Sequence, residues 1–549
     1  MIVESAFIIR STAVFDSIQN TPYPASILVE NGMIQRILPW DAPEADPALA
    51  VVPLCDYGDK LILPSFVDAH THLFSAAIVA SEFVCDTLGE GKSQAACVEI
   101  LKEYARQHPD LERIRGTGWF IGNWEDKILP DKRSLDEAFP DKPVYLQCAD
   151  AHSFWLNSKA LEEAGIEPRP EMDNGVVCTW ENGELTGLLL EPAAYAPAQR
   201  KYMEFSDEQL HGILKDFQGV LAQNGVAAVS EMFADPYSEE TYHRYGLLKK
   251  LDEEGALRSY SYLYTELFGH TDFTEYFALK EAIDSRHITV NGVKGFIDGV
   301  TETHTGLLLE PYEDQPETCG DGLPLWPRER MQEEIIAANR KEIQVRLHCI
   351  ADGSVRMALD MYEKAQQVNQ DDSLRNTVEH IENIHPDDIG RFEKLRVIPS
   401  MQPYHLTLSN NAKSLQIGKE RCRYEWPVRS ILEAGGQMAF GTDCPVVSVN
   451  PFLTIYAAVT RKNDEGVQYS QNPWETVDMA TALKCYTLGA AYVYGKENEM
   501  GSLEAGKRAN LIVLDQNLFE IPEEKIEETK VAVNYFEGEL VYQNARAVI

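Results

Sequence analysis

The middle of the chain repeats one pattern, a short apolar run that ends in polar residues and is followed by a helix-like stretch. The stretches include SDEQLHGILKDFQGVLAQNG, which Ser206 can cap at its N-terminus. Strands that alternate with helices predict parallel strands buried on both faces, and eight of them predict an α/β fold of the (β/α)8 TIM barrel type. The eight runs are LILPSFVDAHTH, GVAAVSEMF, RSYSYLYTE, VKGFIDG, IQVRLHC, NTVEHI, RVIPSMQP and QMAFGTD.

Two parts of the chain lie outside this repeat. Roughly 150 residues separate the first run from the second, which is too long for a simple connection between strand and helix. We therefore expect a barrel at 63–495 with an insertion subdomain at 75–210, between barrel strands 1 and 2. Both chain ends carry short strand-like runs and Gly turns, which predict that 1–62 and 496–549 together form a small β-sandwich.

Composition narrows the classes of partner. The 549 residues, 44% of them hydrophobic, suffice for a large core, and 49 Lys and Arg against 87 Asp and Glu give a net charge of −38. This charge disfavours nucleic acid and anionic membranes, and no apolar run is long enough for a membrane helix. The ten cysteines include no CxxC pair, and the first residues lack the basic region and apolar stretch of a secretory signal. Both observations predict a cytoplasmic protein. A homodimer is the default expectation.

Residues that suit metal binding lie where the predicted strands end. Catalytic groups of such barrels project from the C-terminal ends of the strands. Residues two apart on a strand face the same side, so the first pair of histidines can hold one ion together. The ligand set favours zinc, with manganese, iron or cobalt as alternatives, in one or two ions. The strand-end residues are His70 and His72 at the first strand, Lys294 and Asp298 at the fourth, His348 at the fifth, His380 at the sixth and Asp443 at the eighth. Five of them, His70, His72, His348, His380 and Asp443, are standard metal ligands.

The remaining histidines are interpreted as ordinary core or surface residues, because a single histidine is more often structural than a ligand. This group comprises His108, His211, His243, His270, His287, His385 and His405.

Several motifs resemble those of the amidohydrolase superfamily. They are most similar to its family 3 branch, the N-substituted formamide deformylase-like metal-dependent hydrolases. The resemblance runs almost from end to end and includes the insertion and the C-terminal GSLEAGKRANLIVLD. The motifs that carry it are PSFVDAHTHL, VKGFIDGVTETHTGLLLEPY, RLHCIADGSV, TVEHIENIHPDDIGRF, SMQPYHL and GTDCPVVSVNPFLTIYAAVTR.

The resemblance implies a role for each ligand. His70 and His72 would bind the more buried metal, and His348 and His380 the second. Asp443 would be both ligand and general base. Lys294 would be carboxylated on its amine and bridge two ions; a lysine paired with Asp298 or Glu302 is the alternative. Two positions depart from the usual pattern of the family. Ser65 replaces a glycine that is common at this position, which lies outside the ligand set. His304 replaces the arginine that many relatives carry, so we expect His304 to alter substrate choice.

The expected reaction is hydrolysis of a non-peptide amide bond in a small-molecule substrate. Water activated by divalent metal attacks the carbonyl, and Asp443 takes its proton and passes it to the departing amine. From the insertion, His152 would contact the substrate or stabilise the oxyanion, with a core histidine as the alternative. Trp119, like Trp124 and Trp155, would line the pocket or simply form core. Asp298 is counted among the substrate-binding residues.

Two other functions stay open. An aminohydrolase that deaminates a heterocycle typically carries HxxE at the fifth strand, whereas His348 is followed by Cys-Ile-Ala-Asp352. A non-catalytic barrel scaffold would be marked by lost ligands, and all five histidine and aspartate ligands are present. GxSxG and HExxH are absent from the sequence, and Arg508 replaces the Ser or Thr that a P-loop requires.

Overall fold

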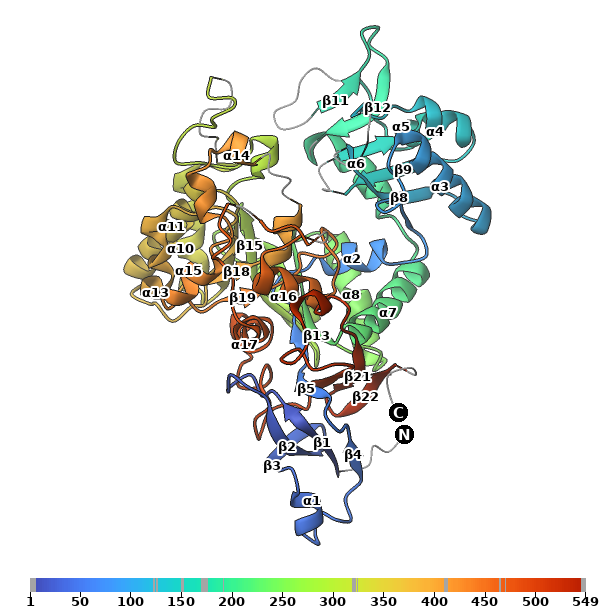
Figure 1. Ribbon diagram of the computed structural model, residues 1–549. Coiled ribbons are helices and arrows are strands. Elements are labelled where there is room, and N and C mark those ends of the chain that lie inside the picture. Colours follow the sequence, from blue (N-terminus) through green and yellow to red (C-terminus); the bar gives the residue numbers. More distant parts are fainter. Residues whose placement is uncertain are drawn as a thin grey trace. The chain divides into compact units, whose positions relative to one another are not determined.

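The computed structural model divides the chain into two compact units (Figure 1). One comprises Met1–Leu73 with Gln218–Ile549, and the other comprises Phe74–Phe217. The structure describes residues 6–121, 124, 127–149, 153–168, 176–190, 192–317, 322, 324–408, 413–463, 466–469 and 471–544.

The first unit contains a curled sheet of eight strands in which every neighbouring pair is parallel. Each of the eight apolar runs supplies one strand, and nearly all strand residues are buried, as expected for a sheet covered on both faces. The strands, in spatial order, are β6 (Phe66–Val67), β13 (Val226–Asp235), β14 (Tyr260–Glu266), β15 (Ile288–Phe296), β16 (Gln344–Cys349), β17 (Thr377–His380), β18 (Ile398–Met401) and β19 (Ala439–Phe440).

The two outer strands of this sheet, β6 and β19, meet through the residues that follow them. The backbone N–H of Ala69 donates to the carbonyl of Phe440 at 3.1 Å, and that of Asp443 donates to the carbonyl of His70 at 2.7 Å. Gly441 permits this approach, because a Cβ there would lie 2.5 Å from the backbone nitrogen of His70. The predicted α/β fold is thus confirmed as TIM-barrel-like.

Helices follow the barrel strands along the chain. Their buried residues recur on one side, as in α11, where Val355, Leu359 and Tyr362 are buried. The helices are α7 (Asp207–Gln223), α8 (Glu239–Glu253), α9 (Thr274–Ile283), α10 (Arg328–Arg340), α11 (Asp352–Asn369), α12 (Pro386–Ile389), α13 (Arg391–Leu395), α14 (Lys413–Gln416), α15 (Val428–Glu433), α16 (Pro451–Thr460), α17 (Met479–Lys484) and α18 (Ala490–Val493). Single turns lie at η2 (Thr301–Thr303), η3 (Pro403–Thr407), η4 (Arg421–Tyr424), η5 (Cys485–Gly489) and η6 (Glu523–Lys525).

Both chain ends of the first unit contribute to one further sheet of eight strands, in the order β22-β21-β20-β5-β1-β2-β3 with β4 beside β1. Its buried side chains, including Ile27, Ile62 and Val513, form a core of their own. The run LILPSF is shared, because Leu61–Pro64 pairs in this sheet whereas Phe66–Val67 belongs to the barrel. The elements are β1 (Ala6–Val14), β2 (Tyr23–Glu30), β3 (Met33–Pro39), α1 (Ala42–Ala45), β4 (Leu54–Asp56), β5 (Leu61–Pro64), β20 (Leu511–Leu514), β21 (Val531–Phe536) and β22 (Glu539–Gln543).

The second unit has its own six-stranded sheet, in the order β11-β12-β10-β9-β8-β7. Trp119, Trp124 and Trp155 are buried against one another, with ring centroids 5.9–6.5 Å apart. Within the described ranges, no helix of either unit is long and apolar enough to cross a membrane. The elements of the second unit are β7 (Cys85–Asp86), β8 (Ile114–Trp119), β9 (Val144–Cys148), β10 (Ser153–Leu156), β11 (Val176–Thr179), β12 (Leu185–Leu190), α2 (Leu73–Val79, which begins at the boundary), α3 (Gln94–Gln107), α4 (Arg133–Ala138), α5 (Ser158–Glu163) and α6 (Pro192–Tyr202).

Candidate metal centre

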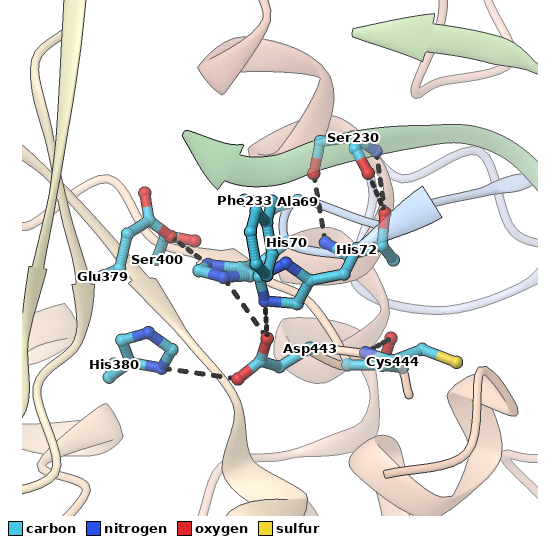
Figure 2. Close-up of polar contacts among 12 residues, drawn as sticks. Ala69, His70, His72, Ser230, Phe233, Glu379, His380, Ser400, Asp443 and Cys444 are labelled. Carbon is cyan, nitrogen blue, oxygen red and sulfur yellow. Dashed lines mark hydrogen bonds and ion pairs between the residues drawn. The ribbon is translucent and has the colours of Figure 1, made fainter. Parts of the chain in front are cut away.

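His70, His72 and Asp443 converge at the C-terminal end of the barrel (Figure 2). Their ligand atoms lie within 4.8 Å of one another. The Nε2 atoms of His70 and His72 lie 3.4 and 2.9 Å from Oδ1 of Asp443. Thr71, between the histidines, is held to β13 because its backbone N–H donates to Ser230 Oγ at 3.0 Å and its hydroxyl donates to the Ser230 carbonyl at 2.5 Å. The backbone therefore turns both imidazoles towards one carboxylate.

A buried chain of polar contacts orients His70. Its Nδ1 faces Oε2 of Glu379 at 2.7 Å, and the other oxygen of Glu379 accepts from Nε of Arg346 at 2.7 Å. All three side chains are at most 1% exposed. Burial and the neighbouring charge of Lys294 lower the pKa of His70 to about 4, so the ring is neutral near pH 7. Arg346 and His70 in turn hold the pKa of Glu379 well below its usual range, although burial alone would raise it.

This arrangement fits a bound cation. A neutral His70 that donates from Nδ1 to Glu379 presents a lone pair on Nε2, and this lone pair faces an oxygen of the Asp443 carboxylate. A positive charge between these two electron-rich atoms, which lie 3.4 Å apart, would make their contact favourable. A carboxylate that holds the second nitrogen of a ligating histidine is the usual support in metal sites. In addition, Nδ1 of His72 and Nδ1 of His380 are buried without a hydrogen-bond partner in the described part of the chain.

A second group of ligand atoms shares Asp443. The side chains of His380, His405 and Asp443 also lie within 4.8 Å of one another, and Oδ2 of Asp443 is 3.9 Å from Nδ1 of His380. The ring of His348 lies 4.4 Å from that of His380, but His348 belongs to neither group, and its Nε2 lies 3.4 Å from the carbonyl of Gly299. The two oxygens of Asp443 thus face two separate sets of imidazoles.

The backbone at the site adopts a conformation that few residues tolerate. His380 and Asp443 have φ angles of 72° and 62°, in the left-handed region. Asp68 stabilises the loop before Asp443, because its carboxylate accepts the Thr442 hydroxyl at 2.7 Å and the backbone N–H groups of Thr442 and His70 at 3.0 and 3.1 Å. Such strain persists only where the surroundings enforce it, and it is common at functional sites.

Lys294 is buried in the barrel, 1% exposed, with its Nζ 5.1 Å from the ring centroid of Phe296. Burial lowers the pKa of this amine to about 8, so an appreciable fraction is neutral near neutral pH. Its proposed alternative partners are engaged elsewhere: Asp298 accepts three backbone N–H groups, and Glu302 lies 3.5 Å from Lys413.

The other predicted site residues occupy different surroundings. The N–H donors to Asp298 come from Leu307, Ile350 and Ala351, so this carboxylate organises the loops after β15 and β16. His304 faces Asp314 at 3.0 Å and packs on Tyr312. Trp119 lies in the core of the second unit and donates to the Leu146 carbonyl at 3.0 Å. His152 lies outside the described residues. The roles assigned to these residues stay predictions.

Sequence reasoning missed two residues near the ligands. One is Glu379, which directly precedes His380. The alternation of apolar and polar residues that marks one face of a half-buried strand is missing from β17, because the whole strand is buried. His405 was interpreted as ordinary, yet it lies on η3 with Nε2 3.8 Å from Oδ2 of Asp443 and Nδ1 3.7 Å from Glu382. Its position four residues after the seventh strand was the available signal, because strand ends carry the functional groups of a barrel.

Comparison with known proteins identifies the family. Residues 54–542 match the Amidohydrolase family. The chain belongs to this family. It is 25% identical to N-substituted formamide deformylase of Arthrobacter pascens over 94% of this chain and 95% of that protein. It is also 27% identical to Protein LONG AFTER FAR-RED 3 of Arabidopsis thaliana, over 93% and 87% of the two chains.

A solved structure extends the likeness to the fold. The amidohydrolase resembles an uncharacterized metal-dependent hydrolase from Pyrococcus horikoshii OT3 with a TM-score of 0.77 and 24% identity, over 94% of this chain and 99% of that one. The family resemblance inferred from the motifs is confirmed. The protein is a hydrolase of carbon–nitrogen bonds, and its His and Asp side chains form the candidate metal site.

Proposed function

We propose that this amidohydrolase uses one or two divalent metal ions, zinc first among them, to hydrolyse a non-peptide amide bond of a small molecule. The observation that carries the proposal is the position of Asp443, whose two oxygens face His70 and His72 on one side and His380 and His405 on the other. The bound metal would lower the pKa of water towards about 7 and polarise the amide carbonyl.

The chain's own residues would move the protons. Asp443 accepts the proton of the attacking water and donates it to the departing amine, because its carboxylate is the group shared by both ligand sets. His70 keeps the tautomer that leaves Nε2 free to ligate, since Glu379 holds Nδ1. His348 and His380 would serve the second ion. His304 would influence substrate choice, and His152, Trp119 and Asp298 are kept as proposed substrate-side residues.

Carboxylation of Lys294 is part of the proposal. The buried amine, with a pKa of about 8, is sufficiently neutral to react with carbon dioxide, and the product would be a bridging carboxylate. Protein incubated with ¹³C-bicarbonate should show a carbamate carbon signal by NMR that is absent in Lys294→Arg. A spectrum without this signal would contradict the carboxylated lysine and leave the ligand histidines untouched.

The test of the function combines metal analysis with a substrate screen. Protein purified without chelator should contain about one or two equivalents of transition metal, and metal-loaded protein should hydrolyse some of a panel of N-acyl and N-formyl amines, lactams and hydantoins.

Asp443→Asn should keep the fold and abolish turnover, while Asp387→Asn, at a side chain 82% exposed, is the matched control. Well under one equivalent of metal, with no activity on adding zinc or manganese, would contradict the proposal. Ammonia release from heterocycles without amide cleavage would assign the deaminase alternative.

The remaining predictions are kept as proposals. The cysteines that the structure describes are free thiols, which suits a reducing cytoplasm. The limits 1–62 with 496–549, 63–495 and 75–210 are our proposed domains, and a homodimer is the proposed assembly. The substrate would be a small amide.

A further inference from the structure

Gln402 carries a buried side-chain amide that finds no hydrogen-bond partner in the described part of the chain. It directly follows β18 and is 1% exposed, yet neither Oε1 nor Nε2 has a hydrogen-bond partner within the residues that the structure describes. Buried amides are nearly always hydrogen-bonded, and one that is not calls for a specific explanation. Gln402 offers a donor and an acceptor on the same edge of one rigid group.

The backbone at Gln402 lies next to the segments that carry His405 and Asp443. Ser400, two residues earlier, faces the barrel interior, since Nη2 of Arg346 lies 3.3 Å from its Oγ. Residues two apart along a strand share a face, so the Gln402 side chain extends from the same face, one layer nearer the C-terminal end. The carbonyl of Met401 accepts from the N–H of Gly441 at 3.1 Å, which sets Gln402 beside the strand that leads to Asp443.

The polar groups near Gln402 are already engaged. The backbone N–H of His405 donates to the Gln402 carbonyl at 3.0 Å, and Nε2 of His405 lies 3.3 Å from the carbonyl of Thr442. Glu382 accepts a hydrogen bond from Lys413. The described residues thus leave the donor and the acceptor of the Gln402 amide without a partner, at the end of the strand where the proposed reaction takes place.

We propose that Gln402 determines specificity by pairing with an amide edge of the substrate. Its Nε2–H donates to the substrate carbonyl, and its Oε1 accepts the substrate N–H. Both bonds form only when carbonyl and N–H lie on the same side, as in a primary carboxamide or a lactam. The site therefore selects such amides over their N-methylated counterparts. This inference rests on the proposed function and deepens it by naming the substrate class.

The test measures ligand binding rather than turnover. Dissociation constants for 2-piperidinone and N-methyl-2-piperidinone are measured by saturation-transfer NMR on the wild type, Gln402→Leu and Gln402→Met, with Gln107→Leu on the exposed end of α3 as the control. We expect the wild type and the control to bind 2-piperidinone at least about 10-fold more tightly than its N-methyl form. Both Gln402 variants should lose this preference through weaker binding of 2-piperidinone.

A second readout separates recognition from a structural role. Removing an unpaired buried amide while keeping its volume should leave the Tm of Gln402→Met equal to or above that of the wild type. A lower Tm, equal binding of both lactams by the wild type, or no binding of either would overturn the inference. If amides are hydrolysed without regard to N-methylation, the proposed function stands and this inference falls. If the binding preference holds but the metal-loaded protein hydrolyses nothing, the inference about Gln402 stands and the proposed function falls.

Discussion

At the scale of single residues, the candidate ligands depend on neighbours outside the candidate ligand set. Arg346 donates to Glu379, to the carbonyl of Ala69 and to Ser400, so one buried guanidinium links three parts of the barrel. Glu379 then sets the tautomer of His70. Gln402 shows the opposite case, an amide that has no hydrogen-bond partner among the described residues, whose burial costs about 1–3 kcal/mol and which the fold nevertheless keeps.

Replacing Arg346 by methionine should therefore destabilise the protein strongly. Glu379 would remain as a buried charge without its guanidinium partner, and breaking such a pair costs about 3–5 kcal/mol. Thermal unfolding should show a much lower Tm, and titration with zinc should show weaker binding because His70 loses its orientation. Arg423→Met, at a side chain 54% exposed, is the matched control and should unfold like the wild type. Equal Tm values for both variants would refute this account.

At the scale of elements, the turn between β21 and β22 connects the terminal sheet to the barrel. Glu537 in this turn accepts the hydroxyl of Tyr260, the first residue of β14, at 2.7 Å. It also pairs with Arg508 and Arg286, and its Oε2 lies 3.4 Å from Nε2 of His287. Burial alone would raise the pKa of Glu537, but the neighbouring His287 and the hydrogen bond from Tyr260 lower it from 4.5 to about 2.

Glu537→Gln should lower the Tm at pH 7, by an amount that corresponds to about 1–2 kcal/mol, because the charged contacts are lost. A carboxylate with a lowered pKa stabilises the fold fully above its unfolded pKa of 4.5 and progressively less as the pH falls towards 2. The Tm difference between wild type and variant should thus be constant from pH 7 to about 5 and shrink at pH 3.5. Glu539→Gln, at an exposed position two residues on, is the control. A difference that grows on acidification would contradict the assigned pKa.

At the scale of the whole molecule, the charge of −38 acts on stability rather than on the site. Like charges on the surface repel one another in the compact state, and salt screens them. The carboxylates at the centre of the barrel are instead paired with Arg346 and the imidazoles, so they are screened little.

Raising NaCl from 20 to 200 mM should therefore increase the Tm by a few degrees. The Debye length falls from about 20 Å to about 7 Å over this range, which removes most surface repulsion. Sucrose at equal osmolality serves as the uncharged control and should shift the Tm less. A Tm that falls with NaCl would mean that attractive surface pairs outweigh the net charge.

How much of the protein follows from the sequence can be judged from particular residues. The repeated apolar runs indicated all eight barrel strands, and the HxH pair with the strand-end His380 and Asp443 indicated where candidate metal ligands gather. These features are local, because strand burial and strand ends leave their mark within a few residues. The motif resemblance identified the family, which the comparison confirms.

Only the tertiary structure decided which distant groups meet. Glu379 and His70 are 309 residues apart, His405 approaches Asp443 through a turn rather than a strand, and LILPSF is divided between two sheets. The left-handed backbone at His380 and Asp443 follows from contacts that surround them. The sequence by itself determined the kind of fold and the kinds of candidate ligand, because both depend on local pattern. Partners, tautomers and the unpaired amide of Gln402 depend on packing between strands far apart in the chain, which local pattern does not encode.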